Sequence, residues 1–407
     1  MSPPAGMAPA MATDCLEPPP NAGSAWTPER LREAIATLPA AELYPELAER
    51  AGEILAGWYL RFPAKVWSRF VKIADSGTGR TQRLPRVLKE FNETSPVLAR
   101  LLTWVSESRA AGHGPLDIVD ICSGFGFLSM FASEMLPRED VEGIYLVDRS
   151  WSNRGVEPSP TSDHISSDHI YGHGDWPIPL LTLKLDMARG SQVRGLAKHV
   201  LAEARPTILC GVHLCGTLSL RACQLFNDSI ASGCGVVGLI LAPCCLPRPQ
   251  HRKRRFVYDL GCHRFGATEL YESKKAAPDS EGCFRPEGAY ATYARHLLEC
   301  LDIEEKSKER IPIHRDSDKG GGQAAQNLFL TARAPYCYAD GSPSVDGFGK
   351  PVVTEVDGKP TSSLQQAAGG KESQESPCEN DEVEGTPAKS LQLDAGDKEQ
   401  ESLCSLS

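Results

Sequence analysis

The stretch at residues 116–129, LDIVDICSGFGFLS, decides the fold of this chain. Residues 116–121 include four aliphatic side chains, which is typical of a parallel strand covered on both faces. Small residues follow at 122–126, and their two glycines allow a sharp turn and the close approach of a ligand. A helix is expected at 127–136, and its first N–H groups can receive a polar or anionic ligand group. A strand, a glycine turn and a helix in this order predict a nucleotide-binding edge of an α/β sheet.

Two acidic residues stand where a nucleoside would need them. Asp148 follows the next expected strand, 143–147, and an acid there suits the hydroxyls of a ribose. Asp120 lies just before the glycine turn and could accept hydrogen bonds from its amides or from a cationic ligand. A bare Gly-x-Gly also forms ordinary βα turns, so the order of the elements carries the prediction. Ser129 stands where the dinucleotide fingerprint has Gly or Ala, which is a departure from that fingerprint.

Strands alternate with helices after this stretch. The expected strands are 116–121, 143–147, 180–185, 207–212 and 236–241, and the expected helices are 127–136, 192–204, 218–232 and 287–301. Residues 151–179 are predicted to form a long polar loop. The alternation predicts an α/β fold with a doubly wound, mostly parallel sheet. Two last strand-like runs, within 303–314 and at 327–332, predict a final hairpin that adds an antiparallel strand.

Residues 27–112 are predicted to form a helical cap that precedes the sheet. Helical patterns cover 28–72, after a start signal at Thr27-Pro28-Glu29, and 83–110, with a break expected at Pro96. Aromatic and basic side chains alternate over 58–72. We favour an amphipathic helix with core aromatics there, and the alternative is a nucleic-acid surface.

Length and charge limit the number of domains and the kinds of partner that the chain can have. The chain has 407 residues, of which 41% are hydrophobic, enough for one large domain or two smaller ones. We predict a sheet domain at 113–335 and disordered segments at 1–26 and 336–407. The net charge is −10, but 336–407 holds 14 acidic and 5 basic residues. The rest is therefore nearly neutral, and an anionic partner is not excluded.

Cysteine use predicts a reducing compartment. Several of the 14 cysteines, such as Cys122, Cys210 and Cys234, lie in strand-like apolar runs rather than in a disulfide framework. The N-terminus lacks the pattern of a signal or transit peptide. We therefore expect an intracellular protein, either cytoplasmic or nuclear. No apolar run reaches the length of a membrane span, so no membrane partner is expected.

Two further stretches follow the fourth and fifth expected strands: GVHLCGTLS at 211–219 and LAPCCLP at 241–247. The carboxyl ends of parallel strands meet at one edge, so we expect the following residues to gather there: Cys122, His213, Cys215, Pro243, Cys244 and Cys245. Zinc is a possible occupant, but without paired C-x2-C spacing we predict no metal and favour cysteines that line a cleft. His213 is a candidate general base or orienting group, with a structural role as the alternative.

Three motifs together resemble the class I S-adenosylmethionine-dependent methyltransferases. They are DICSGFG at 120–126, LVDRS at 146–150 and LKLDMA at 183–188. The resemblance covers about 116–334 and implies a Rossmann-like methyltransferase fold with S-adenosylmethionine as cofactor. It implies cofactor contacts from the turn, the ribose acid and an adenine-side acid, namely Asp120, Cys122, Ser123, Gly124, Gly126, Asp148 and Asp186. Cys122 stands where the family usually has its first glycine.

HLCG, VDRS and PCC in combination resemble a subgroup of that family. The subgroup contains tRNA 2′-O-methyltransferases of the acceptor stem and methyltransferase-like proteins with an HLCG motif. This implies an RNA substrate similar to tRNA. In the mechanism that we predict from the residues, His213 is the candidate catalytic base, and Cys215, Pro243, Cys244 and Cys245 lie on the acceptor side. The chain departs from the tRNA enzymes at Val212, where they have lysine, and at 246–248, where they have a His-His-Arg-Cys run. Their amino-terminal zinc modules also have no counterpart.

One dense basic run, PRPQHRKRR at 247–255, follows the fifth strand. Its strongest charges are Arg252, Lys253, Arg254 and Arg255. A positive loop at 248–255 could hold RNA phosphates without reading the base sequence. The alternatives are a solvated loop and a nuclear localisation signal.

The function predicted from the sequence is methyl transfer from S-adenosylmethionine, with RNA as one candidate acceptor that the sequence does not fix. Two other classes stay open. An NAD-dependent oxidoreductase would share the turn and the ribose acid, although Ser129 and the final hairpin disfavour it. A non-catalytic scaffold with the same fold is the third class, because Cys122 replaces a glycine and His213 is the only base candidate.

Overall fold

The structure, a computed structural model, describes residues 21, 23–73, 84–153, 158–159, 164–202, 205–247, 256–272, 287–313, 327–334 and 390–391. A seven-stranded sheet has the order β3-β2-β1-β4-β5-β9-β8. Its strands are β1 (Leu116–Ile121), β2 (Val141–Asp148), β3 (Leu180–Lys184), β4 (Thr207–Cys215), β5 (Val236–Cys245), β8 (Lys306–Arg310) and β9 (Leu328–Arg333). A small second sheet has the order β10-β6-β7, from β6 (Val257–Asp259), β7 (Arg264–Gly266) and β10 (Ser390–Leu391).

The pairing confirms the predicted fold class. Strands β1 to β5 pair in parallel, whereas β9 runs antiparallel to both β5 and β8. This is the mostly parallel, doubly wound sheet with a final antiparallel hairpin that the alternation of elements predicted. The chain order reverses between β1 and β4, and open α/β sheets bind ligands outside the carboxyl ends of the strands at such a switch point.

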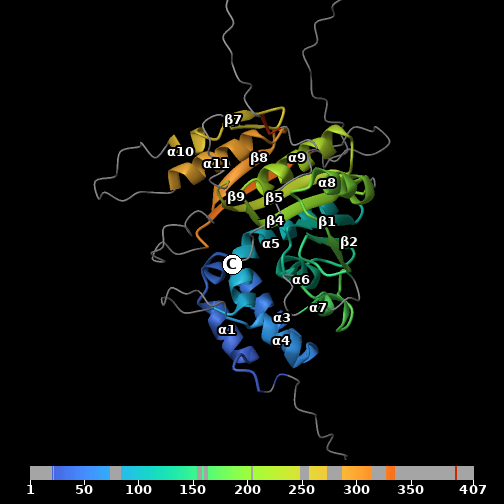
Figure 1. The fold of residues 1–407 in the computed structure, drawn as a ribbon. Coiled ribbons are helices and arrows are strands. Elements are labelled where there is room, and N and C mark those ends of the chain that lie inside the picture. Colours follow the sequence, from blue (N-terminus) through green and yellow to red (C-terminus); the bar gives the residue numbers. More distant parts are fainter. Residues whose placement is uncertain are drawn as a thin grey trace, which may run out of the picture.

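Helices cover both faces of the large sheet (Figure 1). One face carries α5 (Arg86–Ala110) and α6 (Phe127–Met135), and the other carries α8 (Gly190–Leu196), a π-helical turn at Ala197–Leu201, α9 (Leu218–Ala231) and α11 (Glu287–Glu299). The short helices α7 (Asp168–Tyr171) and α10 (Glu269–Glu272) lie in connections. Strand β1 explains the two layers, because Ile118 packs in the α5/α6 core and Val119 packs in the opposite core.

Before α5, the predicted cap contains three short helices, α1 (Pro28–Ala36), α2 (Pro39–Leu43) and α4 (Ala64–Phe70), and one of 17 residues, α3 (Pro45–Arg61). The helical pattern expected over 28–72 is therefore divided, because prolines at 39, 45 and 63 each start a new helix. The stripe over 58–72 supplies core aromatics, as favoured, since Trp58, Phe62, Trp67 and Phe70 are buried. The cap and the sheet share one hydrophobic cluster.

Part of the N-terminal segment expected to be disordered packs against this cap. The Asn21 amide donates hydrogen bonds of 2.7 Å to the carbonyls of Tyr59 and Phe62, and the Asn21 side chain is buried. The Trp67 indole donates to the Ser24 hydroxyl at 3.2 Å. The ordered cap therefore includes Asn21 and Ser24. Of the other residues predicted to be disordered, 1–20, 22 and 336–407 lie outside the described residues, apart from β10.

Helix α5 runs through Pro96, where the sequence suggested a break. An internal proline removes one helical hydrogen bond and costs about 3 kcal/mol. Tertiary contacts hold the helix together, because Asn92 accepts the Ala40 N–H at 3.0 Å and donates to the Ile313 carbonyl at 2.8 Å. The Ser95 hydroxyl also donates to the Phe91 carbonyl at 2.5 Å. Burial of this turn outweighs the local penalty.

Strands β4 and β5 extend beyond their expected ends at 212 and 241. The two strands stay paired as far as Cys215 and Cys245, with register shifts between Val212 and Cys215. The HLC and PCC motifs therefore lie in the last residues of these strands rather than in the following loops. Among the described residues, no helix has both the length and the apolar character needed to cross a bilayer.

Candidate functional site

The turn after β1 adopts an unusual backbone conformation. Cys122, Gly124 and Gly126 have φ values of 59°, 55° and 89°. This left-handed region is open to glycine without strain, whereas other residues adopt it at a cost. Cys122 thus keeps a glycine-like backbone at the position where the family that its motif resembles usually has glycine. Burial and the charge of Asp148 raise the pKa of its thiol, so Cys122 stays protonated.

The two glycines of the turn differ in the space around them. A Cβ atom on Gly126 would come within 2.6 Å of Leu146 Cδ2, whereas a Cβ atom on Gly124 would meet nothing within 4 Å. We expect Gly126→Ala to lower the free energy of unfolding by about 2–4 kcal/mol, from strain and overpacking together. Gly124→Ala should cost only about 1 kcal/mol. Urea unfolding of both variants checks this, and equal losses would contradict it.

Asp148, at the end of β2, faces this turn. Its Oδ2 accepts the Gly124 N–H at 3.0 Å, and its Oδ1 accepts the Ser150 N–H at 2.8 Å. An ionised carboxylate offers about four acceptor sites, so these two bonds fix its orientation and leave acceptor positions for ligand hydroxyls. The structure therefore places Asp148 against the glycine turn, and its role in cofactor binding stays a prediction.

The other two predicted acids have different surroundings. Asp186 lies near Asp148, since the Leu185 N–H donates to the Asp148 carbonyl at 3.2 Å. Its Oδ1 accepts the Ala188 N–H at 2.9 Å. Asp120 is 2% exposed and lies beneath the turn, where it accepts the Ser129 hydroxyl at 2.7 Å. Burial raises the pKa of Asp120 to about 7, opposed by the Ser129 hydrogen bond.

Aromatic groups that the sequence did not single out brace the turn. The Trp151 indole donates to the Ser123 hydroxyl at 3.2 Å. His169 stacks on Phe125 with ring centroids 4.1 Å apart, and its Nε2 lies 2.9 Å from the Phe125 carbonyl. Burial lowers the pKa of His169, which favours a neutral ring that donates this proton. These contacts come from the polar loop expected over 151–179, whose composition does not indicate them.

His213 forms a pair with a buried glutamate. Its Nε2 lies 2.9 Å from Oε2 of Glu93 on α5, and Glu93 is 3% exposed. A proton on Nε2 leaves Nδ1 of the neutral ring as the acceptor. Burial lowers the pKa of His213, but the hydrogen bond with Glu93 and the charges of Glu93 and Glu90 outweigh this and raise it overall. The backbone of His213 is strained, with a φ of 65°, and lies at the irregular end of β4.

The sequence prediction included His213 but missed Glu93. The signal available was a pair of acids three residues apart, Glu90 and Glu93, in the helical pattern predicted over 83–110. Burial raises the pKa of Glu90, whose side chain is partly exposed, whereas Glu93 is buried. An acid and an imidazole in this arrangement can hold one ring tautomer and increase its basicity.

Cys215, Cys244 and Cys245 come together at the ends of β4 and β5. The Sγ atoms of Cys215 and Cys244 are 3.1 Å apart, and those of Cys244 and Cys245 are 3.5 Å apart. Hydrogen bonds from the other two thiols lower the pKa of Cys245. Cys122 is close enough to Cys215, and His213 to Cys245, for their charges to interact. The predicted gathering of these residues at one edge is therefore present.

Two tyrosines of α11 form hydrogen bonds with the backbone of the strand ends beside these cysteines. Tyr290 donates a short hydrogen bond to the Pro243 carbonyl, and Tyr293 donates to the Gly216 carbonyl at 2.6 Å. Pro243 thus contributes a backbone contact to the support of this edge. The predicted RNA contacts, Arg252 to Arg255 within 248–255, lie outside the described residues.

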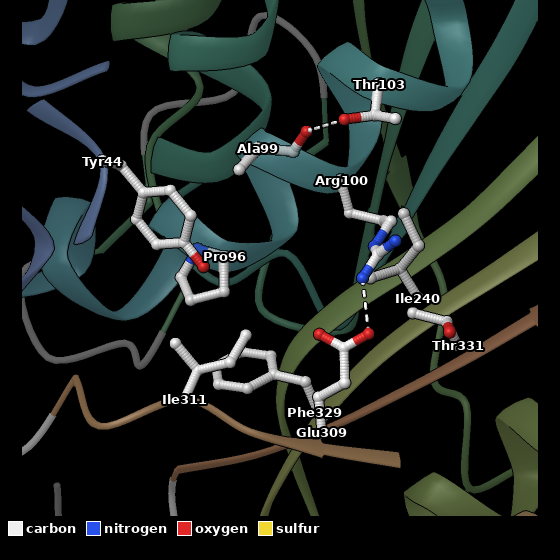
Figure 2. A pocket seen from close by; sticks show the side chains of 10 residues that line it. All are labelled: Tyr44, Pro96, Ala99, Arg100, Thr103, Ile240, Glu309, Ile311, Phe329 and Thr331. Carbon is white, nitrogen blue, oxygen red and sulfur yellow. Dashed lines mark hydrogen bonds and ion pairs between the residues drawn. The ribbon is translucent and has the colours of Figure 1, made fainter. Parts of the chain in front are cut away.

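A separate cavity of about 240 Å³ lies farther along α5 (Figure 2). Tyr44 and Pro96 lie across it from Ile311 and Phe329, and Arg100 forms a 2.6 Å ion pair with Glu309 at its side. Its lining includes none of the predicted site residues. The glycine turn and the ends of β4 and β5 therefore remain the candidate site.

Comparison with known proteins gives only distant similarity. No protein-family model matches the chain, and no curated protein matches it significantly. A solved structure of the DszA carbon methyltransferase aligns over 77% of this chain and 70% of its own, with 16% identity and a TM-score of 0.34.

Two further solved structures are similar to the chain at the same level. The plantazolicin methyltransferase BpumL, in complex with SAH, aligns over 60% of this chain and 84% of its own, with 11% identity and a TM-score of 0.28. A cyclopropane-fatty-acyl-phospholipid synthase-like protein from Lactobacillus casei aligns over 58% and 92%, with 11% identity and a TM-score of 0.28. TM-scores this low do not establish function, so the function must be inferred from the site itself.

Proposed function

We propose that this chain is a methyltransferase that uses S-adenosylmethionine. The observation that carries the proposal is the position of Asp148. It stands at the end of β2, oriented by the Gly124 and Ser150 amides, beside a glycine whose side-chain position is open. The sheet around it has a final antiparallel hairpin, which supports a methyltransferase fold over an ordinary dinucleotide fold.

The residues at this edge match the cofactor in charge and in hydrogen-bonding groups. Asp148 offers acceptors for the two ribose hydroxyls, and Asp186, near it, offers an acceptor on the adenine side. The open face of Gly124 lets a ligand approach the backbone of the turn. The cofactor is cationic at its sulfonium and amino groups, and the carboxylates of this edge complement that charge. When bound, S-adenosylmethionine supplies an electrophilic methyl group.

The acceptor side contributes orientation and a base. An acceptor oxygen or nitrogen at the ends of β4 and β5 would lie beside His213, whose Nδ1 can take its proton as the acceptor attacks. Glu93 holds the other ring nitrogen, so the acceptor atom meets a fixed lone pair. Most of the rate gain in such a transfer comes from holding the reacting atoms in line and in contact.

Asp148→Ala should weaken binding of S-adenosylhomocysteine about 100-fold. Two hydrogen bonds to a charged group are lost, each contributing roughly 1.5 kcal/mol. Titration calorimetry measures the dissociation constant. Glu142→Gln is the matched control, because Glu142 lies on the same strand but is exposed and should leave binding unchanged. Equal binding by wild type and Asp148→Ala would contradict the role of Asp148.

The acceptor is tested by transfer of a labelled methyl group to separate pools of RNA, protein and small metabolites. We propose RNA as the acceptor, on the strength of the HLCG and PCC motifs and the basic run at 252–255. Label in the RNA pool, lost in a variant with Arg252 to Arg255 replaced by serine, would support it. Label only in another pool would reject RNA, and cofactor binding without transfer to any pool would support the scaffold alternative.

A further inference from the structure

We propose that Cys215, Cys244 and Cys245 bind a zinc ion at the carboxyl ends of β4 and β5. The three Sγ atoms all lie within 4.8 Å of one another, and the two closest pairs are 3.1 and 3.5 Å apart. Two sulfurs on one tetrahedral zinc ion, each 2.3 Å from it, are about 3.8 Å apart. The two closest pairs are 0.7 and 0.3 Å short of that spacing, so shifts of less than about 1 Å would bring these sulfurs to it.

The ligand chemistry selects the ion. Three thiolates form a soft donor set, which favours Zn²⁺ or Cu⁺ over Mg²⁺, Ca²⁺ or Mn²⁺. On binding, three Zn–S bonds form, three S–H bonds break and three protons pass to solvent. No electron is transferred, so the site needs no oxidant or reductant. The resulting zinc–trithiolate unit carries a charge of −1.

The protein positions these sulfurs before any ion binds. Cys215 and Cys245 are partners in the β4–β5 pairing, and the Gly216 N–H donates to the Cys245 carbonyl at 3.1 Å. Tyr293 and Tyr290 hold the carbonyls of Gly216 and Pro243, the residues that follow Cys215 and precede Cys244. A preorganised set of ligands loses little conformational freedom on binding.

The absence of C-x2-C spacing does not weigh against this site. That spacing brings two sulfurs of one short segment to a single ion, and here the pairing of two strands does the same. Cys215 and Cys245 are exposed while Cys244 is 8% exposed, so an ion can enter from solvent. Three protein ligands are typical of catalytic zinc sites, which keep the fourth position for water or a substrate.

The test uses the full chain, purified under reducing conditions, loaded with Zn²⁺ and then dialysed. We expect about one zinc ion per chain by elemental analysis, and a thiolate-to-cobalt charge-transfer band when Co²⁺ replaces zinc. Cys215→Ser and Cys245→Ser should each weaken zinc binding by at least about 100-fold, more than a lost second-shell partner costs. Cys234→Ser, just before the opposite end of β5, is the matched control and should bind zinc like wild type.

Thermal unfolding of each metal-free variant shows whether it is folded. Zinc bound equally by wild type and by folded Cys215→Ser would overturn the proposal, as would a Co²⁺ spectrum without the thiolate band. A second group of ligands, His263, His296 and Glu299, lies elsewhere among the described residues. Loss of zinc in His263→Asn but not in the cysteine variants would place the ion there and overturn the proposal too. Each readout is independent of methyl transfer.

Discussion

Replacing His213 by asparagine is expected to lower methyl-transfer turnover by about 100- to 10,000-fold, the range typical of a lost general base. Asparagine keeps the polarity and approximate size of the side chain but cannot take a proton. Affinity for S-adenosylhomocysteine should change little, because His213 lies at the ends of β4 and β5 rather than beside Asp148. The measurement is the turnover rate with the acceptor found by labelled transfer, together with calorimetry of cofactor binding.

Two further variants sharpen this prediction. Glu93→Gln should lower turnover by about 10- to 100-fold, as for other groups that orient a histidine. His199→Asn makes the same substitution at an exposed histidine of the π-helical turn and should have no effect. Equal turnover in wild type and His213→Asn would remove His213 from the mechanism. Loss of cofactor binding in His213→Asn together with turnover would show that His213 acts by supporting the structure around the site.

Asp120→Asn is expected to stabilise the protein above pH 7 and to change the pH dependence of stability. The pKa of Asp120 is raised by burial from 3.8 to about 7. Its contribution to stability is complete below the unfolded pKa and is lost as the pH rises through the folded one. At about 1.4 kcal/mol per pKa unit, the loss amounts to about 4 kcal/mol at alkaline pH. Asparagine stays neutral and avoids it.

Urea unfolding between pH 4.5 and 8 measures this effect. The two stability curves should converge at the acidic end and separate as the pH rises to 7. The charged groups around Asp120 are Asp148 and Glu90, which are the same in both proteins and act to raise its pKa. Ser129→Ala removes the hydrogen bond that opposes the shift, so it should steepen the pH dependence. Parallel curves for wild type and Asp120→Asn would contradict the account.

The fold could be predicted from sequence because its signals are local. The apolar run of β1 and the glycines that follow it fix a strand, a turn and a helix within residues 116–135. The ends of β4 and β5 could not be predicted, because Pro243 is a poor strand former and His213 lies in a register irregularity with a φ of 65°. Pairing of Leu214 with Pro243 and of Cys215 with Cys245 continues the two strands past these positions. The helix break expected at Pro96 was wrong for a similar reason, because tertiary contacts of Asn92 maintain the helix there.

The candidate site also has parts that local sequence predicts and parts that depend on contacts between distant residues. The position of Asp148 beside the glycine turn could be predicted because Asp148 directly follows a predictable strand. Glu93 was missed because its contact with His213 spans 120 residues of sequence. The three cysteines were predicted to lie at one edge, but the distances between their sulfurs depend on the Cys215–Cys245 register, which residue spacing alone does not encode.

The most direct test of the central claim is titration calorimetry of the full chain with S-adenosylhomocysteine and, separately, with NAD. The account predicts binding of S-adenosylhomocysteine in the micromolar range and no comparable binding of NAD. Folded protein that binds NAD instead would support the oxidoreductase alternative. Folded protein that binds neither ligand would contradict the assignment of Asp148 and the glycine turn as a cofactor site.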